Sequence, residues 1–102
     1  MSEQAVIVHF RYGQTDLSPL FELEDQLTKA IDAAGVGEFD GNDVATDGSD
    51  GYLYMYGPDA DRLFEAVQPV LESAACIHDA VARIRYGPPA DGVKEREVLI
   101  GS

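Results

Sequence analysis

Three groups of side chains in this sequence have types and spacing that could do chemistry. The first is Cys76-Ile77-His78, which in an extended segment would put a thiol and an imidazole on one side, as a thiolate nucleophile or a bound metal requires. Two such groups do not make a site, and no second cluster of Cys and His completes the set. The pattern therefore predicts a half-buried cysteine beside a histidine in a loop.

The second group is the acidic stretch 47–51, Asp-Gly-Ser-Asp-Gly, which has a passing likeness to a calcium loop. The bidentate glutamate that closes such a loop is absent at the required spacing, so a hairpin turn explains the stretch better. The third is His9, between Ile7 and Arg11, which could act as an acid or base near neutral pH. A histidine alone is more often structural, and the sequence has no phosphate-binding glycine loop, nucleophile elbow or HExxH motif. We therefore predict no catalytic residue, no metal and no cofactor.

Acidity is the strongest feature of the composition. The chain has 19 Asp and Glu against 7 Lys and Arg, a formal net charge of −12. Such a field repels phosphates and anionic lipids, which argues against unaided binding of nucleic acids or membranes. Residues 30–61 contain acids but no Lys or Arg. This half either keeps the protein soluble or docks a basic partner, for which the candidate residues are Asp40, Asp43, Asp47 and Asp50.

Length and composition favour one α+β domain over residues 1–102, long enough to bury a core without disulfides or a structural metal. No basic segment precedes the short apolar run 5–8, and no apolar stretch reaches the roughly eighteen residues of a membrane span. A lone cysteine fits a reducing compartment. We therefore expect a cytoplasmic protein.

The elements that must position the candidate residues begin with a strand at 5–12, a β-branched and aromatic run that ends at a glycine. Ser18 and Pro19 predict the start of a helix, with Ser18 as the N-cap, and Gly35 predicts its end. The apolar stripe of this helix is predicted to be Leu20, Leu23, Leu27, Ile31 and Ala34. Residues 36–46 predict a strand with a bulge or early turn near 40–43.

A second helix should begin near Asp59, after the hairpin turn and a strand at 52–56. Pro69 should kink or end this helix near Gln68, because proline removes the hydrogen bond to the carbonyl of Glu65. The buried stripe is predicted to be Leu63, Phe64, Val67 and Leu71. The rest of the chain predicts a strand at 80–86, a loop at 87–92 and a strand at 95–100.

Both halves of the chain give a strand, a Tyr-Gly pair and a helix, at Tyr12-Gly13 and at Tyr56-Gly57. Two such halves suit an antiparallel sheet with both helices on one face, because each crossover is right-handed. In this βαββαβ order the chain resembles the ferredoxin-like folds of split βαβ type, and it is similar to small uncharacterised bacterial proteins of that type. The resemblance implies an α+β sandwich with an additional C-terminal strand, and it implies no activity.

Alternation along the predicted strands divides their residues between two faces of the sheet. One set would face the helices: Val6, Val8, Phe10, Leu53, Met55, Ala82, Ile84 and Tyr86. The uncovered face would gather His9, Arg11, Tyr52, Tyr54, Tyr56, Arg83 and Arg85. Arg11, Tyr54 and Arg85 are expected to be neighbours there.

Tyrosine and arginine dominate interface hot spots, so the uncovered face is expected to contact a partner or a second copy of the chain, unless its arginines pair with the protein's own acids. Stacking of RNA bases is opposed by the net charge and by the lack of an RNP pattern. We predict a non-catalytic protein-binding module, for example an acidic inhibitor or immunity-type protein that acts on a basic partner. The alternative is an enzyme or small-ligand binder, with a pocket of His9, Arg11, Tyr54 and Arg85 on this face or at a dimer interface. Both the face and the acidic hairpin stay candidates for the working surface.

Overall fold

A computed structural model describes residues 3–88 and 92–100. Its strands and helices follow the predicted order. They are β1 (Gln4–Arg11), α1 (Ser18–Ala34), β2 (Glu38–Val44), β3 (Asp50–Gly57), α2 (Ala60–Ser73), β4 (His78–Arg85) and β5 (Glu95–Leu99). The predicted loop at 87–92 lies partly outside the described residues, which omit 89–91.

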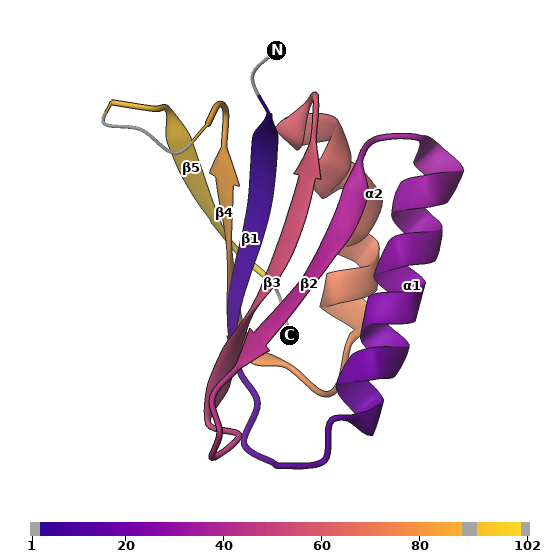
Figure 1. Cartoon of the computed structure of the whole chain (residues 1–102), viewed down its shortest axis with the longest axis vertical. Coiled ribbons are helices and arrows are strands. Elements are labelled where there is room, and N and C mark those ends of the chain that lie inside the picture. Colours follow the sequence, from indigo (N-terminus) through magenta and orange to yellow (C-terminus); the bar gives the residue numbers. More distant parts are fainter. Residues whose placement is uncertain (1–2, 89–91, 101–102) are drawn as a thin grey trace.

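The strands form one 5-stranded antiparallel sheet in the order β2-β3-β1-β4-β5. α1 and α2 contact each other and pack against one face of this sheet (Figure 1). The predicted ferredoxin-like α+β arrangement is therefore confirmed, with β5 as the additional strand beside β4. Among the described residues no helix covers the other face, which we name the open face.

The core lies between the sheet and the helices, and strand alternation explains which residues enter it. Val6, Val8 and Phe10 of β1 have no exposed surface, and each such side chain contributes about 1.5–3 kcal/mol relative to an exposed one. The helices add Leu20, Leu23, Leu27, Ile31, Leu63, Phe64, Val67 and Leu71. The predicted stripes are confirmed except at Ala34, which is exposed in the last turn of α1, where Gly35 (φ 64°) already turns the chain toward β2.

The start of α1 differs from the prediction by one residue. Leu17 is the N-cap and Ser18 is the first helical residue, so the prediction of a Ser18 cap is wrong. The carboxylate of Asp16 replaces that cap, because its Oδ1 accepts a hydrogen bond from the Ser18 amide at 3.0 Å. This hydrogen bond holds the pKa of Asp16 below its usual range. Asp16 therefore stays ionised near the positive end of the helix dipole.

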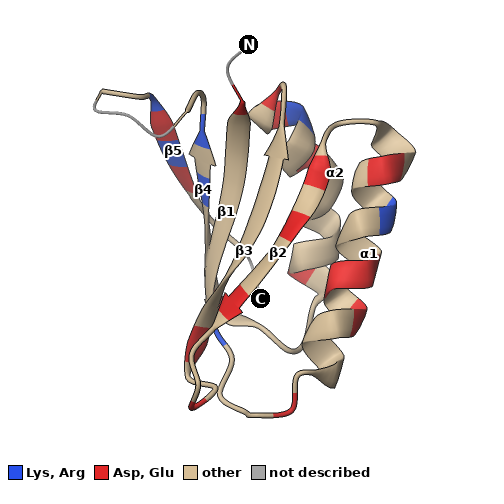
Figure 2. Cartoon of the chain, viewed as in Figure 1, with Lys and Arg blue, Asp and Glu red and all other residues tan. Residues whose placement is uncertain are grey.

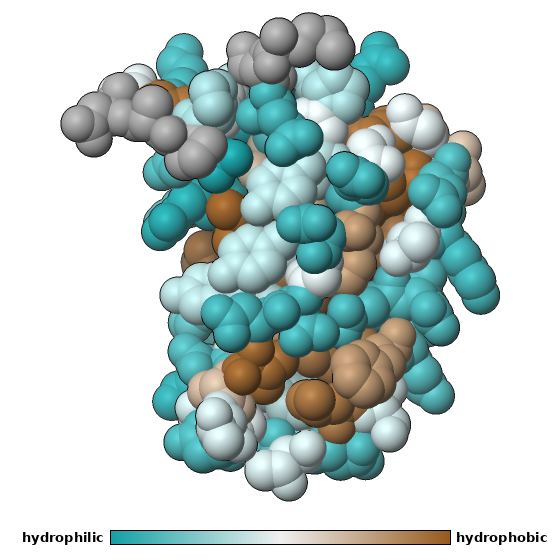
Figure 3. All heavy atoms as spheres, in the orientation of Figure 1, coloured by the Kyte–Doolittle hydropathy of each residue, from teal (hydrophilic) through white to brown (hydrophobic). Residues whose placement is uncertain are grey.

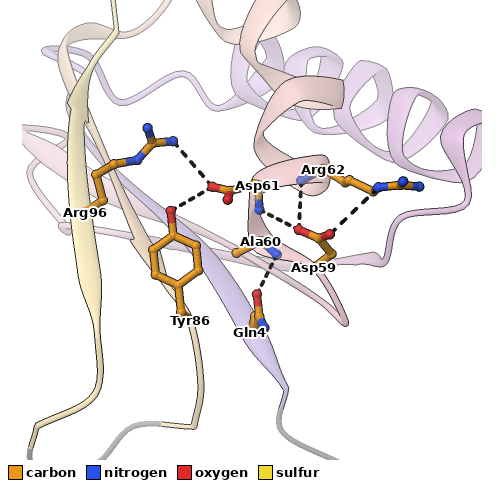
Figure 4. Close-up of polar contacts among 7 residues, drawn as sticks. All are labelled: Gln4, Asp59, Ala60, Asp61, Arg62, Tyr86 and Arg96. Carbon is orange, nitrogen blue, oxygen red and sulfur yellow. Dashed lines mark hydrogen bonds and ion pairs between the residues drawn. The ribbon is translucent and has the colours of Figure 1, made fainter.

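The start of α2 is fixed by two side chains (Figure 4). The helix begins near Asp59, as predicted; Asp59 is the N-cap, and its Oδ1 accepts hydrogen bonds from the amides of Asp61 and Arg62 at 3.1 and 3.2 Å. Oε1 of Gln4, on β1, accepts a hydrogen bond from the Ala60 amide at 2.8 Å. The central strand therefore holds the first turn of α2 in place.

The same helix end is tied to β5 through Asp61 (Figure 4). Its Oδ1 accepts a hydrogen bond from the Tyr86 hydroxyl at 2.7 Å, and Nη2 of Arg96 lies 3.4 Å away. The hydrogen bond to this carboxylate raises the pKa of the Tyr86 phenol. The additional strand is thus fastened to the helical layer as well as to β4.

α2 continues to Ser73 with Pro69 inside it, so the predicted end near Gln68 is wrong, while the kink predicted as the alternative stays a prediction. Proline removes a single backbone hydrogen bond, to the carbonyl of the exposed Glu65. Val67 and Leu71 on either side of it are buried against the sheet. Such packing outweighs the lost bond, because most helical stability in proteins comes from tertiary contacts. Within the described residues, neither helix is long and apolar enough to cross a membrane.

Candidate functional site

The open face is organised in rows across the sheet, because directly paired residues point to the same side. Along β1 the rows are centred on Ala5, Ile7, His9 and Arg11. From one edge to the other they read Glu38-Tyr56-Ala5-Arg85-Glu95, Gly41-Tyr54-Ile7-Arg83-Glu97, Asp43-Tyr52-His9-Val81-Leu99 and, between β3 and β4 only, Asp50-Arg11-His78. The residues predicted for this face therefore lie on one side of the sheet.

β3 carries three tyrosines at alternate positions, Tyr52, Tyr54 and Tyr56, which we name the tyrosine ladder. The rings of Tyr52 and Tyr54 stack, with centroids 6.1 Å apart and planes at 18°. Partial burial raises the pKa of the Tyr54 phenol, and the nearby carboxylate of Asp43 raises it further. The hydroxyl stays protonated at neutral pH and can donate a hydrogen bond. The ladder therefore offers both aromatic surface and hydrogen-bond donors.

His9 lies beside the tyrosine ladder on the neighbouring strand. Its ring centroid is 4.8 Å from that of Tyr52, and its Nε2 is 2.9 Å from Oδ2 of Asp50. The side chains of His9 and Asp50 are 42% and 46% exposed. A carboxylate at the surface therefore holds the imidazole against the ladder and occupies one of its two ring nitrogens.

Two arginines of the open face are paired with acids of the same protein. Arg11 Nη1 lies 3.8 Å from Oδ2 of Asp79, and Arg83 Nη2 lies 3.5 Å from Oε2 of Glu97. Asp79 lies within the irregularity that shifts the pairing of β1 with β4, between His78 and Val81, and its backbone has φ 50°. Because all four side chains are more than half exposed, each pair contributes at most about 1 kcal/mol. These two cations are nevertheless neutralised locally.

Arg85 differs from the other two arginines, since it is only 8% exposed. Its Nε donates a hydrogen bond to the carbonyl of Gly87 at 2.7 Å. The prediction of an exposed Arg85 is wrong, because β5 pairs along the outer side of β4 and removes it from the sheet edge. The prediction that it neighbours Arg11 is also wrong. Their rows are centred six residues apart on β1, about 20 Å along a strand.

The acids predicted for docking, Asp40, Asp43, Asp47 and Asp50, all lie on the β2–β3 hairpin, and we name them the hairpin acids. Asp43 and Asp50 lie on the open face, opposite Tyr52 and Arg11. Asp40 is exposed at the bulge of β2, which confirms the irregularity predicted there. The open face and the acidic hairpin, separate candidates in the sequence, are therefore continuous.

Asp47 lies at the turn of the hairpin rather than on a strand. Its Oδ1 accepts a hydrogen bond from the Ser49 amide at 3.0 Å, and hydrogen bonds from Ser49 lower the pKa of the Asp47 carboxyl. Figure 2 shows acidic residues along β2 and around the hairpin tip, and no Lys or Arg on β2 or β3. The hairpin therefore presents one sign of charge.

Two shallow hollows mark the open face. One, of about 430 Å³, is lined by His9, Arg11, Ser49, Asp50 and Asp79. The other, of about 280 Å³, is lined by Ile7, His9, Tyr52, Val81, Arg83 and Glu97. Neither hollow contains Tyr54 or Arg85. The pocket predicted from His9, Arg11, Tyr54 and Arg85 is therefore not assembled in either of them.

Cys76 and His78 of the Cys76-Ile77-His78 segment lie in different surroundings. Cys76 is half-buried, as predicted, with its Sγ 3.8 Å from the carbonyl oxygen of Pro19. Burial raises the pKa of the thiol, which disfavours the thiolate that nucleophiles and metal sites need. His78 is exposed at the start of β4. Among the residues that the structure describes, no cluster of three or more His, Cys, Asp or Glu could hold a metal ion.

Sequence reasoning missed the contribution of the outer strands to the open face. Leu99 is 80% exposed, and it lies beside Val81 in the same row as His9. Glu38 lies opposite Tyr56 at the other edge. The alternation of residues along β2 and β5 could have predicted these positions. It assigns them to a face of the sheet only once the strands that pair with β2 and β5 are known.

No protein family matches this chain, and no curated protein matches it either.

Proposed function

We propose that this chain is a non-catalytic protein-binding module whose open face recognises a basic partner. The observation that carries the proposal is the tyrosine ladder beside acids that have no basic neighbour along their strands. Glu38 and Asp43 flank the ladder in the rows of Tyr56 and Tyr52, and residues 30–61 hold no Lys or Arg. The surface thus combines aromatic rings with carboxylates that form no ion pair with the described residues.

This combination matches the chemistry of lysine and arginine side chains. Guanidinium and ammonium groups are attracted to tyrosine rings, and carboxylates accept charge-assisted hydrogen bonds from them. Of the carboxylates close to the ladder, Asp43 can accept such bonds, whereas Asp50 already contacts His9. We therefore expect the strongest contacts of the partner at Tyr54 and Asp43.

The charge of the open face favours a basic partner over a second copy of this chain. The cations Arg11 and Arg83 are each paired with an acid of the chain, Arg85 lies beside Glu95, and the face carries further acids at Glu38 and Asp43. A two-fold dimer joined through this face would oppose surfaces of the same negative sign. A basic partner meets no such repulsion.

The edges of the sheet support binding through the face rather than through strand addition. β2 is interrupted by a bulge beside Asp40, and β5 carries Glu95, Arg96 and Glu97 in succession. Bulges and charged residues are devices by which natural sheets avoid edge-to-edge pairing.

In its concrete version, the module inhibits an enzyme with a basic active site, because an acidic surface accelerates the encounter and can imitate an anionic substrate.

An NMR titration of the ¹⁵N-labelled chain with a short arginine-rich peptide, at low salt, tests this proposal. The amide signals of Asp43, Tyr52 and Tyr54 should shift most, and a control peptide with glutamine in place of each arginine should leave them unchanged. Shifts centred on the exposed acids of α1 and α2, or equal shifts with both peptides, would contradict binding at the open face.

A further inference from the structure

A second, apolar surface lies on the other side of β2, where the end of this strand meets the start of α1. Figure 3 shows hydrophobic residues gathered there, in the lower part of the view. They border an open hollow of about 150 Å³, whose lining is Leu17, Val44 and Ala45 together with Gln14, Thr15, Thr46 and Gly48. Phe21, one helical turn after Leu17, is 53% exposed and extends this apolar surface.

The size and rigidity of the hollow suit one inserted side chain. An apolar cavity of about 150 Å³ accommodates a benzene-sized group. Its walls are held together by the hairpin turn, because the carbonyl of Gly48 accepts hydrogen bonds from the amides of Gly13 and Gln14 at 2.7 and 3.2 Å. Gly48 has φ +74°, and a Cβ there would lie 1.9 Å from the Gln14 carbonyl oxygen. The hollow is therefore preformed, which lowers the entropic cost of filling it.

The surroundings of the hollow carry negative charge. Asp16, which precedes Leu17, and Asp47, at the hairpin turn, both have a lowered pKa because Ser18 and Ser49 donate hydrogen bonds to them. The two segments that form the hollow, 12–28 and 30–61, contain no Lys or Arg. Charge complementarity therefore selects an occupant whose apolar side chain is flanked by basic residues.

The hollow and the open face are separated only by the edge strand. Asp43 and Val44 are consecutive residues of β2. Asp43 pairs with Tyr52 and lies on the open face, whereas Val44 pairs with Gly51 and lies on the face that the helices cover. A segment of a basic partner that contacts the tyrosine ladder can therefore reach the hollow by passing over the edge of β2.

We infer that this hollow binds one aromatic or branched aliphatic side chain of the basic partner, so that the recognised segment is a cluster of Lys and Arg with one apolar anchor. This inference rests on the proposed function and names the partner's chemistry more closely. Because an anchor residue desolvated in a pocket is a typical interface hot spot, the hollow contributes affinity while the charges contribute the rate of encounter.

Two kinds of synthetic peptide test the inference by fluorescence anisotropy with the full chain. All the peptides have the same Lys and Arg cluster. The reference peptide has alanine at every uncharged position, and each peptide of the second kind has phenylalanine at one of those positions. The best phenylalanine peptide should bind at least about tenfold tighter than the alanine peptide. The variant Ala45→Leu, which fills the hollow, should reduce this difference to less than about threefold, whereas Ala33→Leu, on an exposed site of α1, should preserve it.

The outcomes separate this inference from the proposed function. Equal affinity of all peptides, or a preference for phenylalanine that survives Ala45→Leu, would overturn the hollow as the anchor site while leaving binding of basic segments intact. Failure of every peptide to bind would overturn both. If Ala45→Leu unfolds the chain, Thr46→Leu replaces it, since Thr46 also lines the hollow and is exposed, and the same loss of the phenylalanine preference is expected.

Discussion

Two arginines of β4, Arg83 and Arg85, lie two residues apart in contrasting surroundings. They allow a matched test of whether the buried Arg85 stabilises the fold. Arg85 is 8% exposed, and its Nε donates a hydrogen bond to the carbonyl of the buried Gly87 at 2.7 Å. Arg83 has a side chain that is 54% exposed and lies 3.5 Å from Glu97. The same substitution, arginine to alanine, should therefore have different consequences at the two positions.

The expected loss of stability follows from these contacts. A hydrogen bond with a charged donor contributes about 1.5–3 kcal/mol, and removing it takes from the buried Gly87 carbonyl the side-chain partner that it has among the described residues. The buried aliphatic stem of the arginine adds packing. We expect Arg85→Ala to lower the free energy of unfolding by about 2–3 kcal/mol. Arg83→Ala removes an exposed ion pair and should cost less than about 1 kcal/mol.

Urea unfolding at pH 7, followed by far-UV circular dichroism, measures both variants against the unsubstituted chain. High salt should diminish the effect of Arg83→Ala and leave that of Arg85→Ala nearly unchanged, because screening acts on exposed charges. Equal losses for the two variants, or a loss under about 0.5 kcal/mol for Arg85→Ala, would refute the assignment of Arg85 as a structural residue.

Three further predictions concern the core, the hairpin and the cysteine. Leu27→Ala should lower the free energy of unfolding by about 2–4 kcal/mol in the same urea assay, because Leu27 is fully buried; a loss under about 0.5 kcal/mol would place it outside the core. Neutralising the hairpin acids together should slow the association of an arginine-rich peptide in stopped-flow measurements more than it speeds dissociation, and an unchanged association rate would leave these acids as solubilising residues only. Because burial raises the pKa of Cys76, iodoacetamide should alkylate the folded chain at neutral pH more slowly than the chain unfolded in urea, and equal rates would contradict that burial.

The features that the sequence predicts well are those set by local periodicity. Leu20, Leu23, Leu27 and Ile31 recur at helical spacing, and the alternation of Val6, Val8 and Phe10 separates the two faces of β1; each of these residues is buried where it was expected to be. The order of strands and helices follows from the same patterns together with the turn residues between them. Helix packing on one face then leaves the tyrosine ladder on the other.

The features that the sequence does not predict depend on contacts between distant segments. The contact of His9 with Asp50 joins β1 to β3 and requires their register, and the burial of Arg85 depends on β5 pairing beside β4. Pro69 led to the wrong prediction of a helix end. The sequence shows the local cost of a proline in a helix, but it does not show that Val67 and Leu71 pack on the sheet. Local rules describe such sites incompletely, since tertiary contacts override propensity.

The central claim is that the tyrosine ladder and its neighbouring acids bind a basic segment, and the affinity of Tyr54→Ala for an arginine-rich peptide tests it most directly. Isothermal titration calorimetry at low salt should show the dissociation constant rising at least about tenfold in this variant, with its melting temperature close to that of the unsubstituted chain. Glu65→Gln, which removes one acid from the exposed surface of α2, serves as the charge control and should change the constant by less than about twofold. Unchanged affinity in Tyr54→Ala, or an equal loss in both variants, would contradict recognition by the open face.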